Sequence, residues 1–286
     1  MMSYPRYLTL PQDYIKNKIK YFLEEDSPQG DFTSIGTIPE TTKCKAYIES
    51  QANITFAGAA IIAAFFDTNT ELKIKVEDGQ KIGNGSIIAE IYGSAREILT
   101  KERIILNLIQ RLSAIATLTS EYVDIAEPYG VKILDTRKTT PGLRLFEKYA
   151  VAVGGGHNHR LDLSSGILIK DNHIASAGSI ANALNNIKKM NLHLPIELEV
   201  ENFEQINEAL DIGVDGFLLD NMPPQKTIEA VKLIRSHKNG KDILIESSGG
   251  INLNTLPEYV KTGINAVSIG QLTHGIKSAD IHIEIF

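Results

Sequence analysis

Basic side chains gather in one stretch of a chain that is acidic elsewhere. From Asp135 to Lys170 the sequence holds six lysines and arginines against three acids, whereas the whole chain carries a formal net charge of -6. Most of these cations stand in loops or directly after apolar runs, so they could converge on one polyanionic ligand. The alternative is a solvated basic surface, but a lysine that follows a buried run, as in LIKDN, is costly unless an anion meets it. The six residues are Arg137, Lys138, Arg144, Lys148, Arg160 and Lys170.

Carboxylates occupy alternate positions in the segment PIELEVEN. Glu197 and Glu199 fall on one face of an expected strand, and the apolar residues between them fall on the other. In a barrel one of these faces points inward, and Asp220 ends the next apolar run, GFLLD. Together these carboxylates suggest a Mg²⁺ site that shares its coordination with substrate phosphates. A buried salt bridge to Lys170 or Arg160 is the alternative, and both roles can coexist.

Glycine-rich turns end the last two apolar runs, SSGG at residues 247–250 and SIG at residues 268–270. Barrel enzymes commonly bind phosphate at such turns with backbone N–H groups and a helix N-terminus. Farther back, His157 and His159 have the H-x-H spacing of some metal sites, but no further histidine completes a convincing ligand set. We therefore expect His159, beside Arg160, to bind an anion, with metal ligation as the alternative.

The elements that position these residues alternate in type from Val131 onward. Short apolar runs end in polar or glycine-rich residues, and helical patterns follow most of them, which predicts the βαβ order of a parallel sheet. Because polar residues collect at the end of every run, a β/α barrel is favoured over an open doubly wound sheet. The runs are VKILDTRK, GILIKDNH, PIELEVEN, GFLLDN, DILIESSGG and AVSIGQLTH.

The first part of the chain has a different organisation. An amphipathic helix is expected after Pro11, because Ile15, Ile19 and Phe22 recur at helical spacing. Short segments rich in β-branched residues and turn signals follow, and a capping box at Ser94 then precedes a long helical stretch. This order predicts a small β-rich unit that a helix connects to the barrel.

Composition excludes several classes of protein. A length of 286 residues favours two structural units, and the acidic net charge argues against non-specific binding to nucleic acid or to anionic membranes. The single cysteine, Cys44, permits neither an internal disulfide nor a cysteine-built metal site. The longest apolar stretch has eleven residues, against the roughly 20 that a spanning helix needs. With no secretion signal at the N-terminus, a cytoplasmic protein is expected.

Read in order, these motifs resemble the quinolinate phosphoribosyltransferase family. DTRKTTPGLR, GGGHNHR and LIKDNH are highly specific in combination, and EEDSPQGDFTS, ERIILNLIQRLSAIATLT, ELEVE, LLDN, ESSGGI and SIGQLTH extend the resemblance over nearly the whole chain. It implies an α/β fold with an incomplete, seven-stranded β/α barrel over residues 113–272. An N-terminal α/β sandwich would take residues 1–112 and the C-terminal tail, about 273–286. A homodimer is also implied, in which Arg103 reaches the neighbouring site.

The resemblance implies a role for each motif. Cations would bind the two carboxylates of quinolinate and contact the phosphoribosyl donor, acids would hold Mg²⁺ with the pyrophosphate and ribose, and the glycine turns would cradle the 5′-phosphate. The implied catalytic residues are Lys138, Lys170, Glu199 and Asp220, the last two also for Mg²⁺. The implied substrate-binding residues are Arg103, Thr136, Arg137, Lys138, His159, Arg160, Lys170, Ser248, Gly249, Gly250, Gly270 and His274.

The implied reaction transfers phosphoribosyl from phosphoribosyl pyrophosphate to quinolinate with decarboxylation, which gives nicotinate mononucleotide for NAD biosynthesis. Alternatives are a related transferase for another anionic base, such as nicotinate, a molybdenum-associated relative, and a non-catalytic nucleotide sensor. Two carboxylates call for more cations than one, so the cationic pocket favours quinolinate, and Glu199 with Asp220 argues against a sensor. The sequence departs from many members at Ala152, where they have arginine, and at Ala114, where they have glycine.

Overall fold

The computed structural model describes residues 3–286, which form two compact units. The barrel unit contains residues 3–6, 121–144 and 156–274, and the sandwich unit contains residues 7–120, 145–155 and 275–286. Three segments lie elsewhere than a division of the chain at residue 112 would put them. Residues 3–6 belong to the barrel unit, whereas residues 113–120 and 145–155 belong to the sandwich unit.

A parallel sheet of six strands, in the order β6-β11-β10-β9-β8-β7, forms the centre of the barrel unit. Each strand coincides with one of the six apolar runs, so the predicted α/β fold is confirmed. The runs fold this way because apolar side chains on both faces of a parallel strand are buried, against the interior and against the covering helices. The strands are β6 (Lys132–Leu134), β7 (Ile167–Ile169), β8 (Ile196–Val200), β9 (Gly216–Asp220), β10 (Leu244–Ser248) and β11 (Ala266–Ser268).

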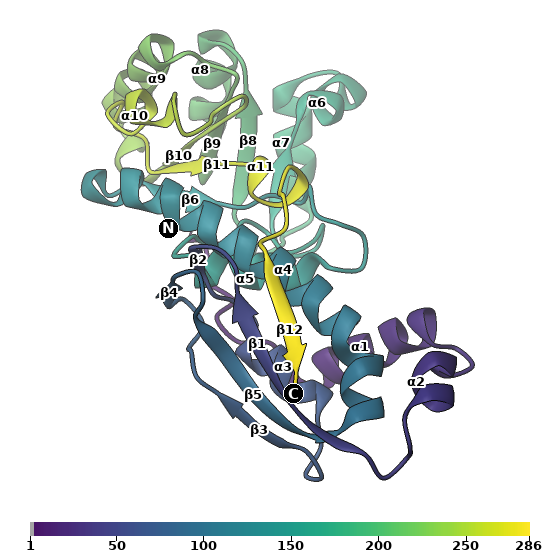
Figure 1. Ribbon diagram of the computed structural model, residues 1–286. Coiled ribbons are helices and arrows are strands. Elements are labelled where there is room, and N and C mark those ends of the chain that lie inside the picture. Colours follow the sequence, from purple (N-terminus) through teal and green to yellow (C-terminus); the bar gives the residue numbers. More distant parts are fainter. Residues whose placement is uncertain (1–2) are drawn as a thin grey trace. The chain divides into compact units, whose positions relative to one another are not determined.

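Helices alternate with these strands and pack around the outside of the sheet (Figure 1). Ser179 and Asn202 begin two of them by accepting a hydrogen bond from a backbone N–H three residues on, which satisfies an otherwise unpaired donor. The helices of this unit are α6 (Asp171–Ala177), α7 (Ile180–Lys189), α8 (Phe203–Ile212), α9 (Pro224–Ser236), α10 (Leu256–Tyr259) and α11 (Gln271–His274).

The barrel is incomplete on the side between β6 and β7. The resemblance implied seven strands, whereas six are hydrogen-bonded into the sheet of the described chain, with β6 and β7 at its edges. Beside β6, His157 makes a single parallel bridge with Leu134. Residues 157–160 therefore follow the edge of β6 without forming a full strand.

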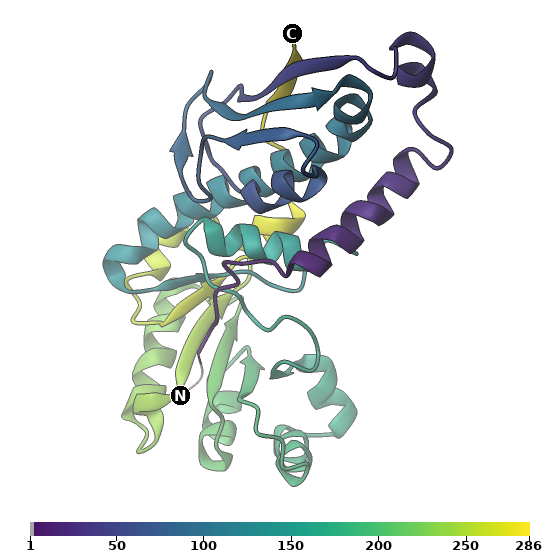
Figure 2. The same ribbon diagram turned by 90° about the horizontal axis from the view of Figure 1, so that it is seen from below.

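The sandwich unit contains an antiparallel sheet in the order β12-β1-β5-β3. The chain's last strand pairs with β1, where Ile283 lies opposite Ile48. Alternate side chains of β1 are buried, and helices cover that face of the sheet (Figure 2). The strands are β1 (Lys43–Ser50), β3 (Glu71–Ile74), β5 (Ile87–Ser94) and β12 (Ile281–Ile285), and β2 (Ile54–Thr55) pairs with β4 (Lys81–Ile82). The helices are α1 (Gln12–Asp26), α2 (Phe32–Thr37), α3 (Ala59–Phe65), α4 (Ala95–Ala126), whose end lies in the barrel unit, and α5 (Arg144–Val153).

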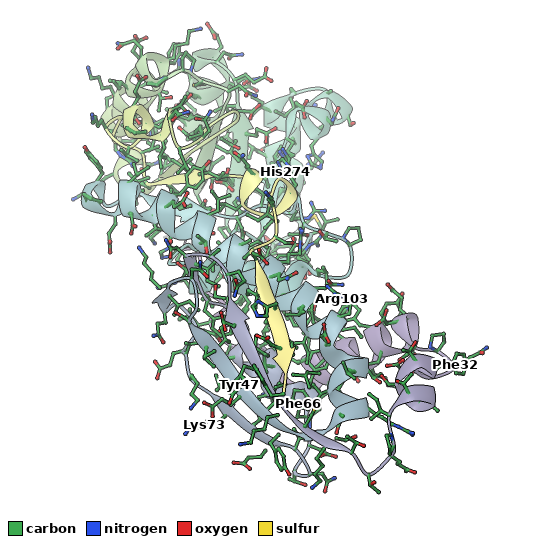
Figure 3. The ribbon with its side chains drawn as sticks, viewed as in Figure 1. Phe32, Tyr47, Phe66, Lys73, Arg103 and His274 are labelled. Carbon is green, nitrogen blue, oxygen red and sulfur yellow. The ribbon has the colours of Figure 1, made fainter. Side chains whose placement is uncertain are left out.

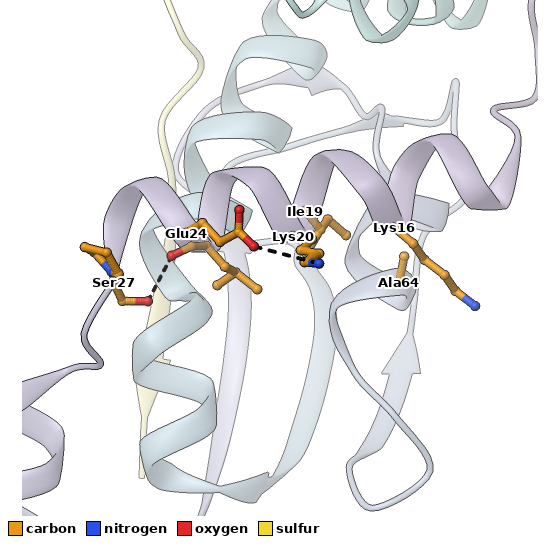
Figure 4. Close-up of a pocket in the computed structure, with 8 residues that line it drawn as sticks. Lys16, Ile19, Lys20, Glu24, Ser27 and Ala64 are labelled. Atoms are coloured by element: carbon orange, nitrogen blue, oxygen red, sulfur yellow. Dashed lines mark hydrogen bonds and ion pairs between the residues drawn. The ribbon is translucent and has the colours of Figure 1, made fainter.

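A groove of about 370 Å³ runs along α1 in the sandwich unit (Figure 4). Lys16, Leu23 and Ala64 are among its lining residues, and the second lysine there, Lys20, faces Glu24 at 3.9 Å. The groove contains none of the predicted site residues. Among the described residues, no helix is both long and apolar enough to cross a membrane.

Candidate active site

Strand register brings the predicted site residues of the barrel unit to one rim. Ser248, the last residue of β10, lies opposite Asp220 of β9 and Ser268 of β11. On the other side, Ile169 of β7 lies opposite Leu198 of β8, so the residues that follow them, Lys170 and Glu199, are also neighbours. Because carboxyl ends of parallel strands meet at one edge, the polar residues that follow the strands share that rim.

Lys170 and Glu199 form an ion pair at this rim. The Lys170 side chain is 42% exposed and the Glu199 side chain 12% exposed, so the pair is open to solvent from the lysine side. The backbone N–H of Lys170 donates to Nδ1 of His173 at 3.0 Å, which fixes the start of α6. The salt bridge that the sequence left as an alternative for Glu199 is therefore present.

Two arginines make the rim strongly cationic. The pKa of Arg160 is lowered, first by burial and then by the positive charge of Arg137. Its Nη1 donates to the carbonyl of Gly166 at 3.0 Å, while nearby Asp162 is hydrogen-bonded to Ser164. An anion that reaches this place would relieve the repulsion between the guanidinium groups, and planar arginine forks suit carboxylates.

The acidic side of the rim offers oxygen ligands. Asp220 accepts a hydrogen bond from Nδ2 of Asn221 at 2.8 Å, and Asn221 itself has a left-handed backbone, φ 51°. Mg²⁺ takes oxygen ligands and is commonly bound by one or two carboxylates plus substrate phosphates. Glu199, the second-last residue of β8, and Asp220, the last residue of β9, supply such donors, so the residues present fit this metal. Sequence reasoning missed Asn221, although it follows Asp220 directly in LLDN.

Two glycines at the rim, Gly249 and Gly270, are closely packed. Gly249 has φ 99°, and a Cβ there would overlap the Asn221 side chain and lie 3.0 Å from its backbone nitrogen. A Cβ at Gly270 would lie 3.1 Å from Cδ of Lys138 and 3.2 Å from Nε2 of His274. The turns thus bring backbone N–H groups, a lysine and a histidine to one place.

Other predicted residues hold this turn in position. The Lys138 backbone N–H donates to Thr136 Oγ1 at 3.0 Å, and Thr273 Oγ1 donates to the Lys138 carbonyl at 2.7 Å. Gly250 has φ 64° with open space where a Cβ would stand. Lys138 is exposed, so its ammonium group is available to an anion.

His159 is buried, with 7% of its surface exposed. Its Nδ1 accepts from the Arg160 backbone N–H at 2.7 Å, and its Nε2 lies 3.0 Å from a carboxylate oxygen of Glu197. Since Nδ1 accepts, the proton belongs on Nε2, which donates to Glu197. Direct binding of an anion by His159 stays a prediction. His157 and His159 do not form a metal-ligand set together, because the group of possible ligands that contains His159 does not include His157.

That group lies in the barrel interior and was missed by sequence reasoning. It consists of His159, Glu197 and Glu246, all buried, with ligand atoms within 4.8 Å of one another. Burial and the charge of Glu197 raise the pKa of Glu246 to about 7. Tyr4 donates to Glu246 at 2.7 Å and reaches Glu197 at 3.2 Å. The only signal for Glu246 was a charged residue inside the apolar run DILIESS.

The remaining residues singled out in the sequence are divided between the two units. Arg103 is exposed on α4 of the sandwich unit, and His274 ends α11 of the barrel unit (Figure 3). Lys148 and Ala152 are fully buried in the part of α5 that belongs to the sandwich unit. Arg144 stays in the barrel unit, where it donates to Thr139 Oγ1 at 3.1 Å. Lys148, one of the six clustered cations, therefore belongs to the sandwich unit.

Comparisons with known proteins agree over the whole length. The quinolinate phosphoribosyl transferase C-terminal domain model matches residues 115–284, and the N-terminal domain model matches residues 31–113. A Bacillus subtilis (strain 168) protein described as a probable nicotinate-nucleotide pyrophosphorylase (carboxylating) is 44% identical, over 95% of this chain and 93% of its own length. A Mycobacterium leprae nicotinate-nucleotide pyrophosphorylase (carboxylating) is 37% identical, over 96% of this chain and 98% of its own. The structure of the Francisella tularensis nicotinate-nucleotide pyrophosphorylase superposes with a TM-score of 0.92 at 35% identity, covering 99% of this chain and 100% of that one. The family models and these relatives show that the chain belongs to the quinolinate phosphoribosyl transferase family.

Proposed function

We propose that the protein transfers phosphoribosyl from phosphoribosyl pyrophosphate to quinolinate and releases CO₂ and pyrophosphate, with nicotinate mononucleotide as product. The observation that carries this proposal is the cationic rim, in which Arg137 lies close enough to Arg160 to lower its pKa and Lys170 stands at the next strand end. Such a concentration of positive charge suits a dicarboxylate better than a monocarboxylate such as nicotinate.

The bonding changes need no general base for the first step. The pyridine nitrogen of quinolinate attacks the anomeric carbon with its own lone pair, and the bond from that carbon to pyrophosphate breaks with its electrons on oxygen. The C2–carboxylate bond then breaks, CO₂ leaves, and the electron pair stays at C2 beside the cationic ring nitrogen. A proton from a donor at the site completes the product.

The protein's contribution is therefore electrostatic and geometric. Carboxylates and phosphates repel one another, and the cations of the rim offset that repulsion while they align nitrogen and carbon. The glycine turns after β10 and β11, with Lys138 and His274, would hold the 5′-phosphate. Glu199 and Asp220 would hold Mg²⁺, which neutralises charge on the departing pyrophosphate.

The assembly and location are part of the proposal. A homodimer would let the exposed Arg103 of one subunit complete the site of the other, as the family resemblance implies. The single buried cysteine accords with the reducing cytoplasm.

The test is release of CO₂ and pyrophosphate from phosphoribosyl pyrophosphate, measured with quinolinate and Mg²⁺, with nicotinate run in parallel. Both products should appear with quinolinate alone. Turnover of nicotinate instead would identify a related transferase, and tight binding of phosphoribosyl pyrophosphate without turnover of either base would identify a sensor.

A further inference from the structure

The first described residues of the chain enter the barrel unit. Tyr4 is 7% exposed and packs in one cluster with Leu134, Leu244 and Ala266, which belong to three different strands. Its ring lies 5.4 Å from the ring of His159, centroid to centroid. The Tyr4 side chain thus fills space beside β6, β10 and β11 in the barrel unit.

The same N-terminal segment holds residues 157–160 through the backbone. The carbonyl of Pro5 accepts from the Asn158 N–H at 2.8 Å. From the other side, buried Asp135 accepts from Asn158 Nδ2 at 2.6 Å and from the His159 N–H at 2.9 Å. Residues 157–160 lie where the barrel lacks a full strand, so these bonds replace the ladder that would otherwise fix their position.

The Tyr4 hydroxyl group also bridges two buried carboxyl groups. It donates to Glu246 at 2.7 Å and lies 3.2 Å from Glu197, whose other oxygen contacts His159 at 3.0 Å. Without that hydroxyl group, two carboxyl groups would share a low-dielectric interior with one fewer donor, and such a partly satisfied network is costly. His159 is in turn bonded to the backbone of Arg160.

We propose that Tyr4 is a positioning residue for the base-binding pocket. Its hydroxyl group donates to Glu246 and lies against Glu197, and it thereby holds the two carboxyl groups that flank Nε2 of His159. The ring then sets the backbone at Arg160, whose guanidinium group binds a substrate carboxylate. This inference rests on the proposed function. It assigns the N-terminal segment to recognition of the base and not to recognition of phosphoribosyl pyrophosphate.

The experiment compares Tyr4→Phe with the full-length wild-type protein. The phenylalanine keeps the ring in its packed position and removes only the hydroxyl group. We expect the KM for quinolinate, and its Kd by calorimetry, to rise about tenfold, the loss of one hydrogen bond to a charged group, while the KM for phosphoribosyl pyrophosphate stays within about twofold. Tyr129→Phe is the matched control, because Tyr129 is exposed in the turn Glu127–Tyr129, and its constants should equal those of the wild type.

A double variant tests whether the hydroxyl group acts through the acids. Glu246→Gln removes one carboxylate and supplies an N–H donor, so the combination Tyr4→Phe with Glu246→Gln should recover part of the quinolinate affinity. Additive effects of the two changes would overturn the route through Glu246. An unchanged quinolinate KM in Tyr4→Phe, or an equal rise in both KM values with a lower melting temperature, would overturn the positioning role. Failure of the wild type to turn over quinolinate would instead overturn the proposed function.

Discussion

Lys170 and Glu199 are joined in an ion pair that links the ends of β7 and β8. Glu199 is the partner of this lysine in the structure, and under the proposed function a substrate carboxylate would be a second partner at the same place on the rim. The pair keeps the ammonium group oriented towards the site, and an arriving anion would find it already in position.

Lys170→Ala should nearly abolish quinolinate turnover while the fold persists. Truncating one partner of a buried or substrate-bound charge pair costs about 2–5 kcal/mol, and we expect Arg137→Ala to lose activity to a similar degree. The measurement is kcat/KM for quinolinate, with circular dichroism to verify folding. Lys189→Ala, at an exposed position of α7, is the control. Wild-type kinetics in both site variants would contradict the assignment of the cationic rim.

Gly249→Ala should weaken binding of phosphoribosyl pyrophosphate. The new Cβ would overlap Asn221 and so displace the neighbour of Asp220, besides the cost of about 1–2 kcal/mol for a left-handed backbone. Gly130→Ala separates the two effects, because Gly130 has φ 68° with nothing within 4 Å of a Cβ. A rise in the KM for phosphoribosyl pyrophosphate in Gly249→Ala, absent from Gly130→Ala, is the expected result. An equal rise in this KM in both variants would mean that backbone strain alone, and not the overlap with Asn221, causes the effect.

Asp220→Asn should raise the Mg²⁺ concentration needed for half-maximal activity by about tenfold, because the uncharged amide is a weaker ligand for a hard cation. Chelation of Mg²⁺ from the wild type should stop pyrophosphate release, and added Mg²⁺ should restore it. Asp211→Asn is the control, since the Asp211 side chain is 89% exposed on α8. An unaltered Mg²⁺ dependence in Asp220→Asn would remove Asp220 from the metal site.

Glu246→Gln should stabilise the protein in a way that depends on pH. The pKa of Glu246 is raised from the ordinary 4.5 to about 7, chiefly by burial. The folded chain therefore holds this proton up to a higher pH than the unfolded chain, and the contribution to stability present below pH 4.5 is lost as pH rises to about 7. Glutamine does not titrate, so the variant keeps its stability in that pH range. The unfolding free energy of the variant minus that of the wild type should therefore rise by up to roughly 3 kcal/mol between low and high pH. Urea unfolding at pH 5 and pH 8 measures it, and a difference independent of pH would contradict the raised pKa.

The sequence predicted the rim well because strand ends are local features. Apolar runs that stop at Lys170, Asp220 or Ser248 place these residues without any knowledge of packing. Alternation in β8 put Glu197 and Glu199 on one face of the strand but did not decide which face points inward. Contacts between distant residues carry no such signal. Tyr4 meets Glu197 and Glu246 across 193 and 242 positions, and the N-terminal sequence looked only like a lead-in to α1.

The count of strands and the turn at Asn221 show another limit. The resemblance implied seven strands, but residues 157–160 form one bridge. One backbone bond from Asn158 to Pro5 and two bonds to the Asp135 side chain hold the rest of this segment. Asn221 has a left-handed backbone and lies against Gly249, a contact between two strand ends that the local sequence does not reveal.

The pairing of Tyr4 with Glu246 also orders events during synthesis. The ribosome makes the tyrosine 242 positions before its acceptor, a delay of roughly 12–50 s at about 5–20 residues per second. The edge of β1 waits almost as long for β12, because Ala46 of β1 pairs with Ile285. Neither unit can finish folding in the order in which it is made, so a nascent chain exposes an unfilled barrel and an unpaired β1 edge until Glu246 and residues 281–285 have been synthesised. Surfaces of this kind are prone to aggregation while they are exposed.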